Sequence, residues 1–173
     1  MAPAAAYIIE RLTPAHDLSQ FDCGNEALNL WLKRFAWMNV QNDSARVYVL
    51  HRRDKAVLGY YALTAGSISR EEAPARVAKG LAAHPIGVAV LGRLAVDLGQ
   101  QGLGLGQTLL QDALLRIAQA GDAIAIRAVL VQAINEPARK FYSRFGFVSS
   151  TVDEMRMLLL MKDLREAVRS FDV

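Results

Sequence analysis

A glycine-rich loop is the part of the sequence best suited to bind an anion. Gly102, Gly104 and Gly106 are spaced by two, between an apolar strand predicted at Gly87–Asp97 and an amphipathic helix predicted from about Leu105 to Ala120. Glycine lets the backbone curl without Cβ clashes, so successive N–H groups can converge on one ligand. The helix N-terminus adds unpaired donors and the positive end of its dipole. The loop therefore predicts a pyrophosphate site.

The residues around this loop narrow the class of phosphate ligand. A Walker loop ends in Gly-Lys-Ser/Thr, and neither Lys nor Ser follows Gly106. A dinucleotide-binding fold places an acidic residue at the end of its second strand, whereas the strand predicted at Ile126–Ala133 ends in Gln132 and Ala133. Taken alone, the glycines are explained equally well by close packing of a strand and a helix.

A second group of residues directly follows the strand at Ile126–Ala133. Asn135 and Pro137 open a helix predicted at Glu136–Phe145, which contains Tyr142. Asn is a good helix cap and Pro suits a first turn, so this segment also has a purely structural explanation. However, adjacent parallel strands converge at their C-terminal ends, where ligands bind in open sheets. We therefore expect Tyr142 to lie near the ligand of the glycine loop.

The other predicted elements complete an α+β fold with a mixed central sheet of about six to seven strands flanked by helices. They are an edge strand at Tyr7–Leu12, a helix at Asn25–Gln41, a hairpin of Arg46–His51 with Ala56–Ala65, a short helix at Pro74–Leu81, a strand at Met155–Met161 and a helix at Asp163–Ser170. A crossover joins the central parallel pair. No linker divides the chain, so we expect a single domain over 1–173.

The composition indicates a folded protein of the cytoplasm. Hydrophobic residues make up 53% and charged residues 21%, which is outside the disordered range. The longest apolar run is interrupted at Gly92 and Arg93, and Met1–Tyr7 lacks the features of a secretory signal, so we expect no membrane association. A single cysteine, Cys23, suits a reducing compartment. The net charge of +3 is compatible with a polyanionic ligand but does not establish one.

The two motifs together resemble the Gcn5-related N-acetyltransferase (GNAT) superfamily. They read Gln101-x-x-Gly104-x-Gly106 and Asn135-x-x-Ala138-x-x-Phe141-Tyr142-x-x-x-Gly146-Phe147. The resemblance implies splayed central parallel strands, acetyl-CoA as cosubstrate, no metal, and Tyr142 as the general acid toward the departing thiolate. The cofactor-binding residues that it implies are Leu94, Ala95, Val96, Gln101, Gly102, Leu103, Gly104, Leu105, Gly106, Gln107 and Asn135.

A narrower resemblance covers most of the chain. The segments Phe21-Asp22-Cys23-Gly24, Gly59-Tyr60-Tyr61-Ala62-Leu63 and Leu91-Gly92-Arg93-Leu94-Ala95-Val96-Asp97 are similar to the acetyltransferase toxins of bacterial toxin–antitoxin pairs. This implies acetylation of the α-amino group of aminoacyl-tRNA, which blocks translation. It also implies neutralisation by a ribbon-helix-helix antitoxin, through which operator DNA is bound. We further expect a homodimer.

The pKa of the acceptor amine also favours an aminoacyl ester as the substrate. A lysine amine, with a pKa of about 10.4, needs a base at neutral pH, whereas a free α-amino group, with a pKa of about 7.7–8.0, is already partly neutral. An adjacent ester lowers the α-amino pKa further. Neither motif contains a histidine, and Gln132 stands where the family often has an acid. An aminoacyl ester therefore suits this site better than lysine.

Two alternatives stay open: an acetyltransferase for a small amine or protein N-terminus, and an acyl-CoA-binding interaction module without turnover.

Several basic residues are candidates for contacts with tRNA. Arg93 lies inside an apolar strand, where it either pairs with a buried carboxylate or points into the substrate cleft. We favour the cleft, because strand alternation puts Arg93 on the same side as Ala95. The candidates for phosphate contacts are Lys33 and Arg34 on the first helix and Arg76 and Lys79 on the short helix.

Overall fold

The fold is a mixed seven-stranded sheet with flanking helices, as predicted. A computed structural model describes residues 6–82 and 84–171 of the chain. The strand order is β1-β2-β3-β4-β5-β7-β6. The strands are β1 (Ile8–Arg11), β2 (Arg46–His51), β3 (Val57–Ile68), β4 (Ile86–Val96), β5 (Ala128–Gln132), β6 (Val148–Ser149) and β7 (Arg156–Leu160). The α-helices are α1 (Glu26–Leu30), α2 (Ala36–Gln41), α3 (Ala75–Ala78), α4 (Leu105–Ala123), α5 (Glu136–Ser143) and α6 (Met161–Ser170). No helix in the described ranges is long and apolar enough to cross a membrane.

The chain forms two compact units, and each unit combines two segments of the sequence. The first unit comprises residues 1–64 and 93–113, and the second comprises residues 65–92 and 114–173. The strands β3 and β4 and the helix α4 therefore contribute residues to both units.

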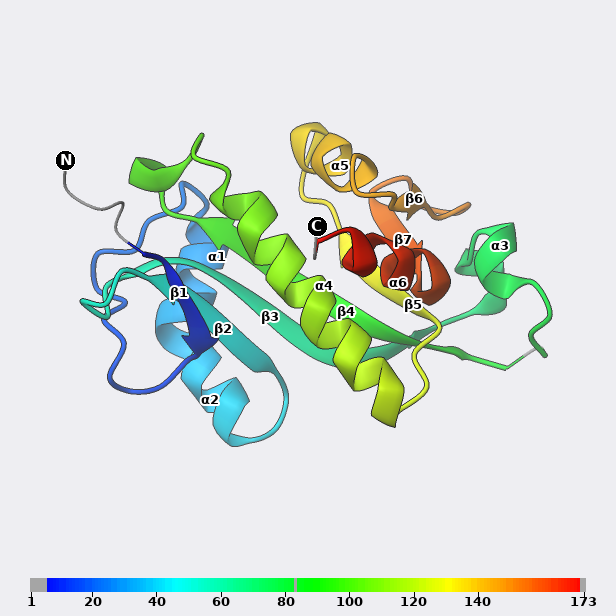
Figure 1. The fold of residues 1–173 in the computed structure, drawn as a ribbon, viewed down its shortest axis with the longest axis horizontal. Coiled ribbons are helices and arrows are strands. Elements are labelled where there is room, and N and C mark those ends of the chain that lie inside the picture. The colour runs from blue at the N-terminus through cyan, green and yellow to red at the C-terminus, as the bar shows by residue number, and fades with distance from the viewer. Residues whose placement is uncertain (1–5, 83, 172–173) are drawn as a thin grey trace. The chain divides into compact units, whose positions relative to one another are not determined.

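The first unit contains the edge strand and the hairpin that the sequence predicts. Here β1 pairs antiparallel with β2, and β2 pairs antiparallel with β3 (Figure 1). One face of these strands packs against the segment that contains α1 and α2. The core on this face includes Leu32, Ala36, Val47, Val49, Tyr60 and Ala62. Alternate residues of β2 and β3 thus supply the apolar side, as strand geometry requires.

The helix predicted at Asn25–Gln41 is interrupted by a π-helical turn, Trp31–Phe35. Its start is well defined, because the side chain of Asn25 accepts a hydrogen bond from the backbone N–H of Leu28 at 3.0 Å. A π turn adds one residue and so rotates every later position by about 100° around the axis. Phe35 and Met38, which the uninterrupted pattern places on the buried face, are consequently exposed.

The second unit contains the central parallel pair. Here β4 and β5 run parallel, with Val88 opposite Ala128 and Leu91 opposite Val131. The predicted crossover connection is therefore confirmed. The neighbours β7 and β6 follow in antiparallel pairing (Figure 1). Every residue of β5 except Gln132 is buried, as expected for a strand covered on both faces.

Some predicted boundaries in the second unit are wrong. The short helix, predicted at Pro74–Leu81, covers only Ala75–Ala78. The carbonyls of Arg76, Val77 and Lys79 accept hydrogen bonds from the guanidinium of Arg127 in place of further helical N–H groups. The last helix begins at Met161, two residues before the predicted start at Asp163. Met161 and Leu164 are buried residues of one helix face. The sequence analysis missed β6, which has only two residues.

The packing of the first helical segment yields a prediction about stability. Leu32 is fully buried, whereas Leu30 in the same segment is 45% exposed. We expect Leu32→Ala to lower the free energy of unfolding by about 2–5 kcal/mol, because it leaves a cavity in the core. Leu30→Ala carries the same change in helix propensity and should cost less than about 1 kcal/mol. Equal losses for the two variants in urea unfolding would contradict this packing.

Candidate active site

The glycine loop follows β4 in the first unit, where the sequence analysis placed it. Asp97 directly follows the strand, and its side chain accepts a hydrogen bond from the N–H of Gly99 at 3.0 Å, which caps one turn of 3₁₀ helix. Gly102 and Gly104 then adopt φ angles of +82° and +79°. L-residues with side chains rarely adopt this conformation, so both positions require glycine. The helix α4 begins directly afterwards at Leu105.

The loop offers the open space that a pyrophosphate needs. A Cβ atom built on Gly102 or Gly104 meets no heavy atom within 4 Å, apart from its chain neighbours. The helix that follows has 19 residues, so its first turn presents free N–H groups and a full dipole beside the loop. This combination fits the diphosphate of acetyl-CoA, which the residues from Gly102 to Gln107 would hold.

The loop is held by hydrogen bonds to a segment that comes much earlier in the chain. The N–H of Leu98 donates to the carbonyl of Asp22 at 2.8 Å, and the N–H of Asp22 donates to the Asp97 carboxylate at 2.9 Å. The side-chain amide of Gln101 donates to the carbonyls of Val96 and Cys23 at 3.0 and 3.3 Å. Gln101, predicted to contact the cofactor, thus uses its side chain to position the loop.

Arg93 stacks on an aromatic ring in the first unit. Its guanidinium carbon lies 4.2 Å from the ring centroid of Trp31, and Trp31 stacks on Tyr60 with 6.0 Å between centroids. Across residues 6–82 and 84–171, no carboxylate forms an ion pair with Arg93, so the alternative of a buried carboxylate partner is not supported. A cation–π contact of this kind contributes about 0.5–2 kcal/mol and leaves the charge of Arg93 unneutralised.

Cys23 is not set up as a nucleophile. It is partly buried, and burial is the main cause that raises the pKa of its thiol. Reactive cysteines have lowered pKa values. This agrees with its structural place in the segment that holds the loop.

The second motif lies in the second unit, on α5. The side chain of Asn135 accepts a hydrogen bond from the N–H of Ala138 at 2.9 Å, so it caps the helix as expected. After the helix, Gly146 adopts a φ angle of +93°, the left-handed conformation that glycine commonly supplies at the end of a helix. Asn135 is therefore required by the fold, whether or not it also binds pantetheine.

Tyr142 is buried among aromatic side chains of the second unit. Its ring makes edge contacts with Phe141 and Phe147, at centroid distances of 5.2 and 5.5 Å. Burial raises the pKa of the Tyr142 hydroxyl to about 12. The hydroxyl is therefore protonated at neutral pH, so it can donate a proton but cannot act as a base there.

The basic residues predicted to contact tRNA phosphates differ in how far their side chains are already engaged by other groups. Lys33 and Arg34 are exposed, and Lys33 donates a long hydrogen bond of 3.4 Å to the carbonyl of Ser19. Arg76 is engaged by both carboxylate oxygens of Asp163, at 2.7 and 3.1 Å. Lys79 is exposed. Arg76 is consequently the least available of these four side chains for a contact with RNA.

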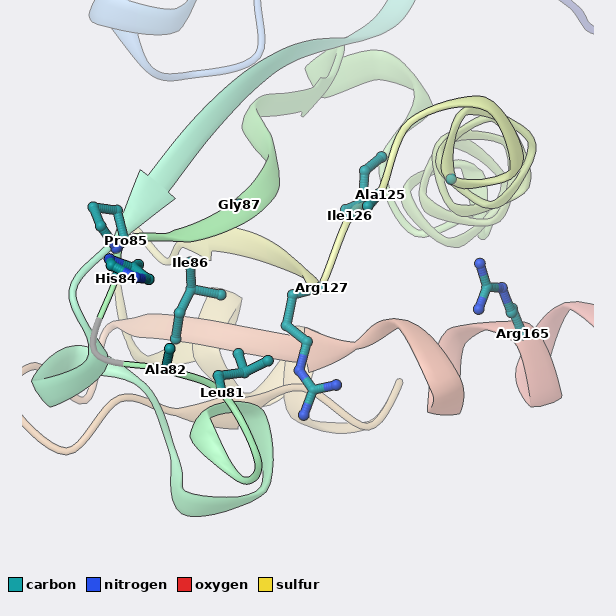
Figure 2. A pocket seen from close by; sticks show the side chains of 11 residues that line it. Leu81, Ala82, His84, Pro85, Ile86, Gly87, Ala125, Ile126, Arg127 and Arg165 are labelled. Carbon is teal, nitrogen blue, oxygen red and sulfur yellow. The ribbon is translucent and has the colours of Figure 1, made fainter.

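A cavity of about 490 Å³ lies in the second unit, and the sequence analysis did not anticipate it (Figure 2). It is lined by residues at the starts of β4 and β5, by Leu81 and by Arg165. Figure 2 shows Arg127 at its edge, but that guanidinium is occupied by three backbone carbonyls. Ligands in open sheets bind at the opposite, C-terminal ends of parallel strands. The cavity contains none of the predicted site residues.

The glycine loop yields a prediction about cofactor binding. We expect Gly104→Glu to abolish acetyl-CoA binding measured by calorimetry, because a side chain and a negative charge enter the space for the diphosphate. Gly80→Glu is the matched control, since Gly80 has a φ of +78° and the same open surroundings outside the loop. The control should lose similar stability and still bind. Equal affinities for both variants would remove the loop from the site.

Comparison with known proteins places the chain in a family. The family described as acetyltransferase (GNAT) domain matches residues 43–149. The tRNA-acetylating toxin of Mycobacterium tuberculosis (strain ATCC 25618 / H37Rv) is 41% identical over 158 residues, which are 91% of this chain and 94% of that protein.

Two solved structures are similar over almost the whole chain. AtaT complexed with acetyl-methionyl-tRNAfMet is 34% identical with a TM-score of 0.87, and the match covers 93% of this chain and 98% of AtaT. A tyrosine-to-phenylalanine mutant of AtaT, bound to the C-terminus of the antitoxin AtaR and acetyl-CoA, is also 34% identical. Its TM-score is 0.79, with 92% of this chain and 96% of that chain covered. The chain belongs to the GNAT family of acetyltransferases.

Proposed function

We propose that this acetyltransferase transfers an acetyl group from acetyl-CoA to the α-amino group of an aminoacyl-tRNA and thereby blocks translation. The observation that carries the proposal is the similarity to a tRNA-acetylating toxin across 91% of the chain. That span includes the segments that build the loop and the helix that carries Tyr142. The structure of AtaT with acetyl-methionyl-tRNAfMet supports the same class of substrate.

The partners follow from the same comparison. The AtaT complex with its antitoxin AtaR supports a neutralising partner for this chain as well. We propose that the partner is of the ribbon-helix-helix type, that it brings operator DNA, and that the toxin is a homodimer. Aminoacyl-tRNA is consumed by ribosomes, so we place the protein in the cytoplasm.

The residues of the first unit would bind acetyl-CoA and orient its thioester. The N–H groups from Gly102 to Gln107 would hold the diphosphate, and the backbone of Leu94–Val96 would pair with the pantetheine amides. An N–H beside Ala95 or Val96 would stabilise the oxyanion that forms when the amine attacks the carbonyl. Such a preorganised donor supplies a large part of the rate in acyl transfer.

Tyr142 would complete the reaction as the acid. When the carbon–sulfur bond breaks, its electron pair goes to sulfur, and Tyr142 donates the proton that makes the thiol. The attacking nitrogen loses one proton in return, so the proton count balances. Because burial raises the pKa of Tyr142 to about 12, the hydroxyl keeps its proton throughout the physiological pH range.

The basic side chains would attract the tRNA. Lys33, Arg34 and Lys79 are exposed, and Arg93 keeps its positive charge while stacked on Trp31. Contacts with phosphates give affinity that depends on salt and not on sequence. We assign Arg76 a smaller share because Asp163 already pairs with it.

Replacing the acid tests the enzymatic part of the proposal. Tyr142→Phe removes one hydroxyl and keeps the ring packing, so it should lower the acetylation rate of charged tRNA by about 10²–10⁴-fold. Acetyl-CoA affinity and the melting temperature should stay close to those of the wild type. Expression of the wild type should arrest bacterial growth, and expression of the variant should be tolerated. Wild-type turnover by the variant would exclude Tyr142 as the acid.

Reversing charge on the first helical segment tests the substrate. We expect the double change Lys33→Glu and Arg34→Glu to slow acetylation of charged tRNA and to flatten its salt dependence, because two phosphate contacts are lost. Lys162→Glu with Arg169→Glu, two exposed residues of α6, is the matched control with the same change in charge. The measurement is initial rate against salt concentration. If both double variants follow the wild-type curve, a small amine becomes the better substrate.

A further inference from the structure

Two buried histidines and a glutamate converge in the first unit, and none of the three belongs to the loop that binds acetyl-CoA in the proposal above. His51 pairs with Ile8 in the register of β1 and β2, so it lies diagonally opposite Glu10 on the same face of the strand pair. His16 follows β1 in a turn in which its N–H donates to the carbonyl of Thr13. The Nε2 atoms of His16 and His51 lie 2.9 and 2.7 Å from the same oxygen, Glu10 Oε1.

A lysine ammonium already occupies the open side of this cluster. The Nζ atom of Lys55, in the turn between β2 and β3, lies 2.8 Å from Glu10 Oε1. The hydrogen bond from Lys55 is the main cause that lowers the pKa of Glu10 to about 2, and those from His16 and His51 add to it. The carboxylate is therefore ionised at physiological pH, and the cluster attracts positive charge.

Hydrogen bonding alone does not satisfy this arrangement. Three nitrogen atoms, those of Lys55, His16 and His51, crowd around one oxygen, Glu10 Oε1, which has two lone pairs. The side chain of His51 is 1% exposed, and its Nδ1 atom has no hydrogen-bond partner. Buried polar atoms are normally paired, so His51 is incompletely satisfied as the cluster stands. A cation placed between the three side chains would replace the competing contacts.

We propose that Glu10, His16 and His51 form a binding site for a divalent transition-metal ion, with Zn²⁺ as the best-suited ion. Their ligand atoms all lie within 4.8 Å of one another. Two imidazoles and one carboxylate suit Zn²⁺, Co²⁺ or Ni²⁺, whereas Mg²⁺ and Ca²⁺ prefer oxygen ligands alone. The fourth position faces Lys55, whose side chain is 46% exposed and can turn into water.

The geometry requires only small movements. Tetrahedral Zn²⁺ with bonds of about 2.0–2.1 Å separates its ligand atoms by roughly 3.3 Å, about half an ångström more than the present distances. The side chain of Glu10 is 38% exposed, so it has room to move. His16 Nδ1 accepts a hydrogen bond from the backbone N–H of Thr13 at 3.0 Å and lies 3.2 Å from Thr13 Oγ1. A metal on Nε2 places the ring proton on Nδ1, so the ring has to turn from the N–H toward Oγ1, which then accepts that proton as the outer partners of metal-bound histidines do. The imidazole stays neutral in this exchange.

The third histidine provides the matched control for a binding experiment. The metal-free wild type is titrated with Zn²⁺ by calorimetry, and with Co²⁺ by its visible absorption spectrum. We expect one ion per chain, no binding of Mg²⁺, and a loss of affinity of at least about tenfold in Glu10→Gln and His16→Ala. His84→Ala should bind as the wild type does, because His84 lies outside the cluster. Equal affinities for Glu10→Gln and the wild type would overturn the site.

Lys55 gives the sharper test, because its removal should improve binding. In Lys55→Met the ammonium no longer competes for Glu10, so Zn²⁺ should bind more tightly and raise the melting temperature further at the same concentration. This variant keeps both histidines and the carboxylate, and its circular dichroism spectrum checks the fold. Absence of one-to-one binding in both the wild type and Lys55→Met would show that the cluster is a hydrogen-bonded network only.

Discussion

The proposed reaction depends on the backbone of the glycine loop, whose N–H groups have to be available to bind a diphosphate. Gly102 and Gly104 allow this because their φ angles are positive and their Cα atoms face open space. Such a loop is easily distorted, and hydrogen bonds from other parts of the chain stabilise it. The carboxylate of Asp97 and the side chain of Gln101 bond to the backbone of the loop itself and of the segment around Asp22. Polar side chains thus hydrogen-bond to the protein's own backbone, and in the proposed reaction the loop N–H groups bind the diphosphate.

The first helical segment contributes to the core and, in the proposed function, to the binding of the substrate. Its π turn keeps Leu32 and Ala36 in the core while it turns Phe35 and Met38 outward. The same turn carries Lys33 and Arg34, and it presents the ring of Trp31 to Arg93. A π turn inside a helix is rare and frequently marks a functional site. This agrees with the place given to the segment in substrate binding.

The sequence is sufficient for most of the helices and strands and for the motifs whose spacing is local. The glycines of the loop, the cap at Asn135 and the left-handed Gly146 follow from backbone rules that act within a few residues. The π turn was missed, because one extra residue alters the helix phase without a composition signal. The bonds of Gln101 and the pairing of Arg76 with Asp163 were missed as well, since they join residues brought together only by tertiary packing. The cluster at Glu10 shows the same limit, because its histidines are spaced unlike any metal motif.

The central claim is that the acetyl group is placed on the α-amino group of an amino acid that is esterified to tRNA. It is tested most directly by incubating the protein with charged tRNA and isotopically labelled acetyl-CoA. The aminoacyl group is then released and identified by mass spectrometry. The account predicts the label on the α-amino nitrogen of the released amino acid, with uncharged tRNA unlabelled. Label on lysine side chains or small amines, with charged tRNA unmodified, would contradict it.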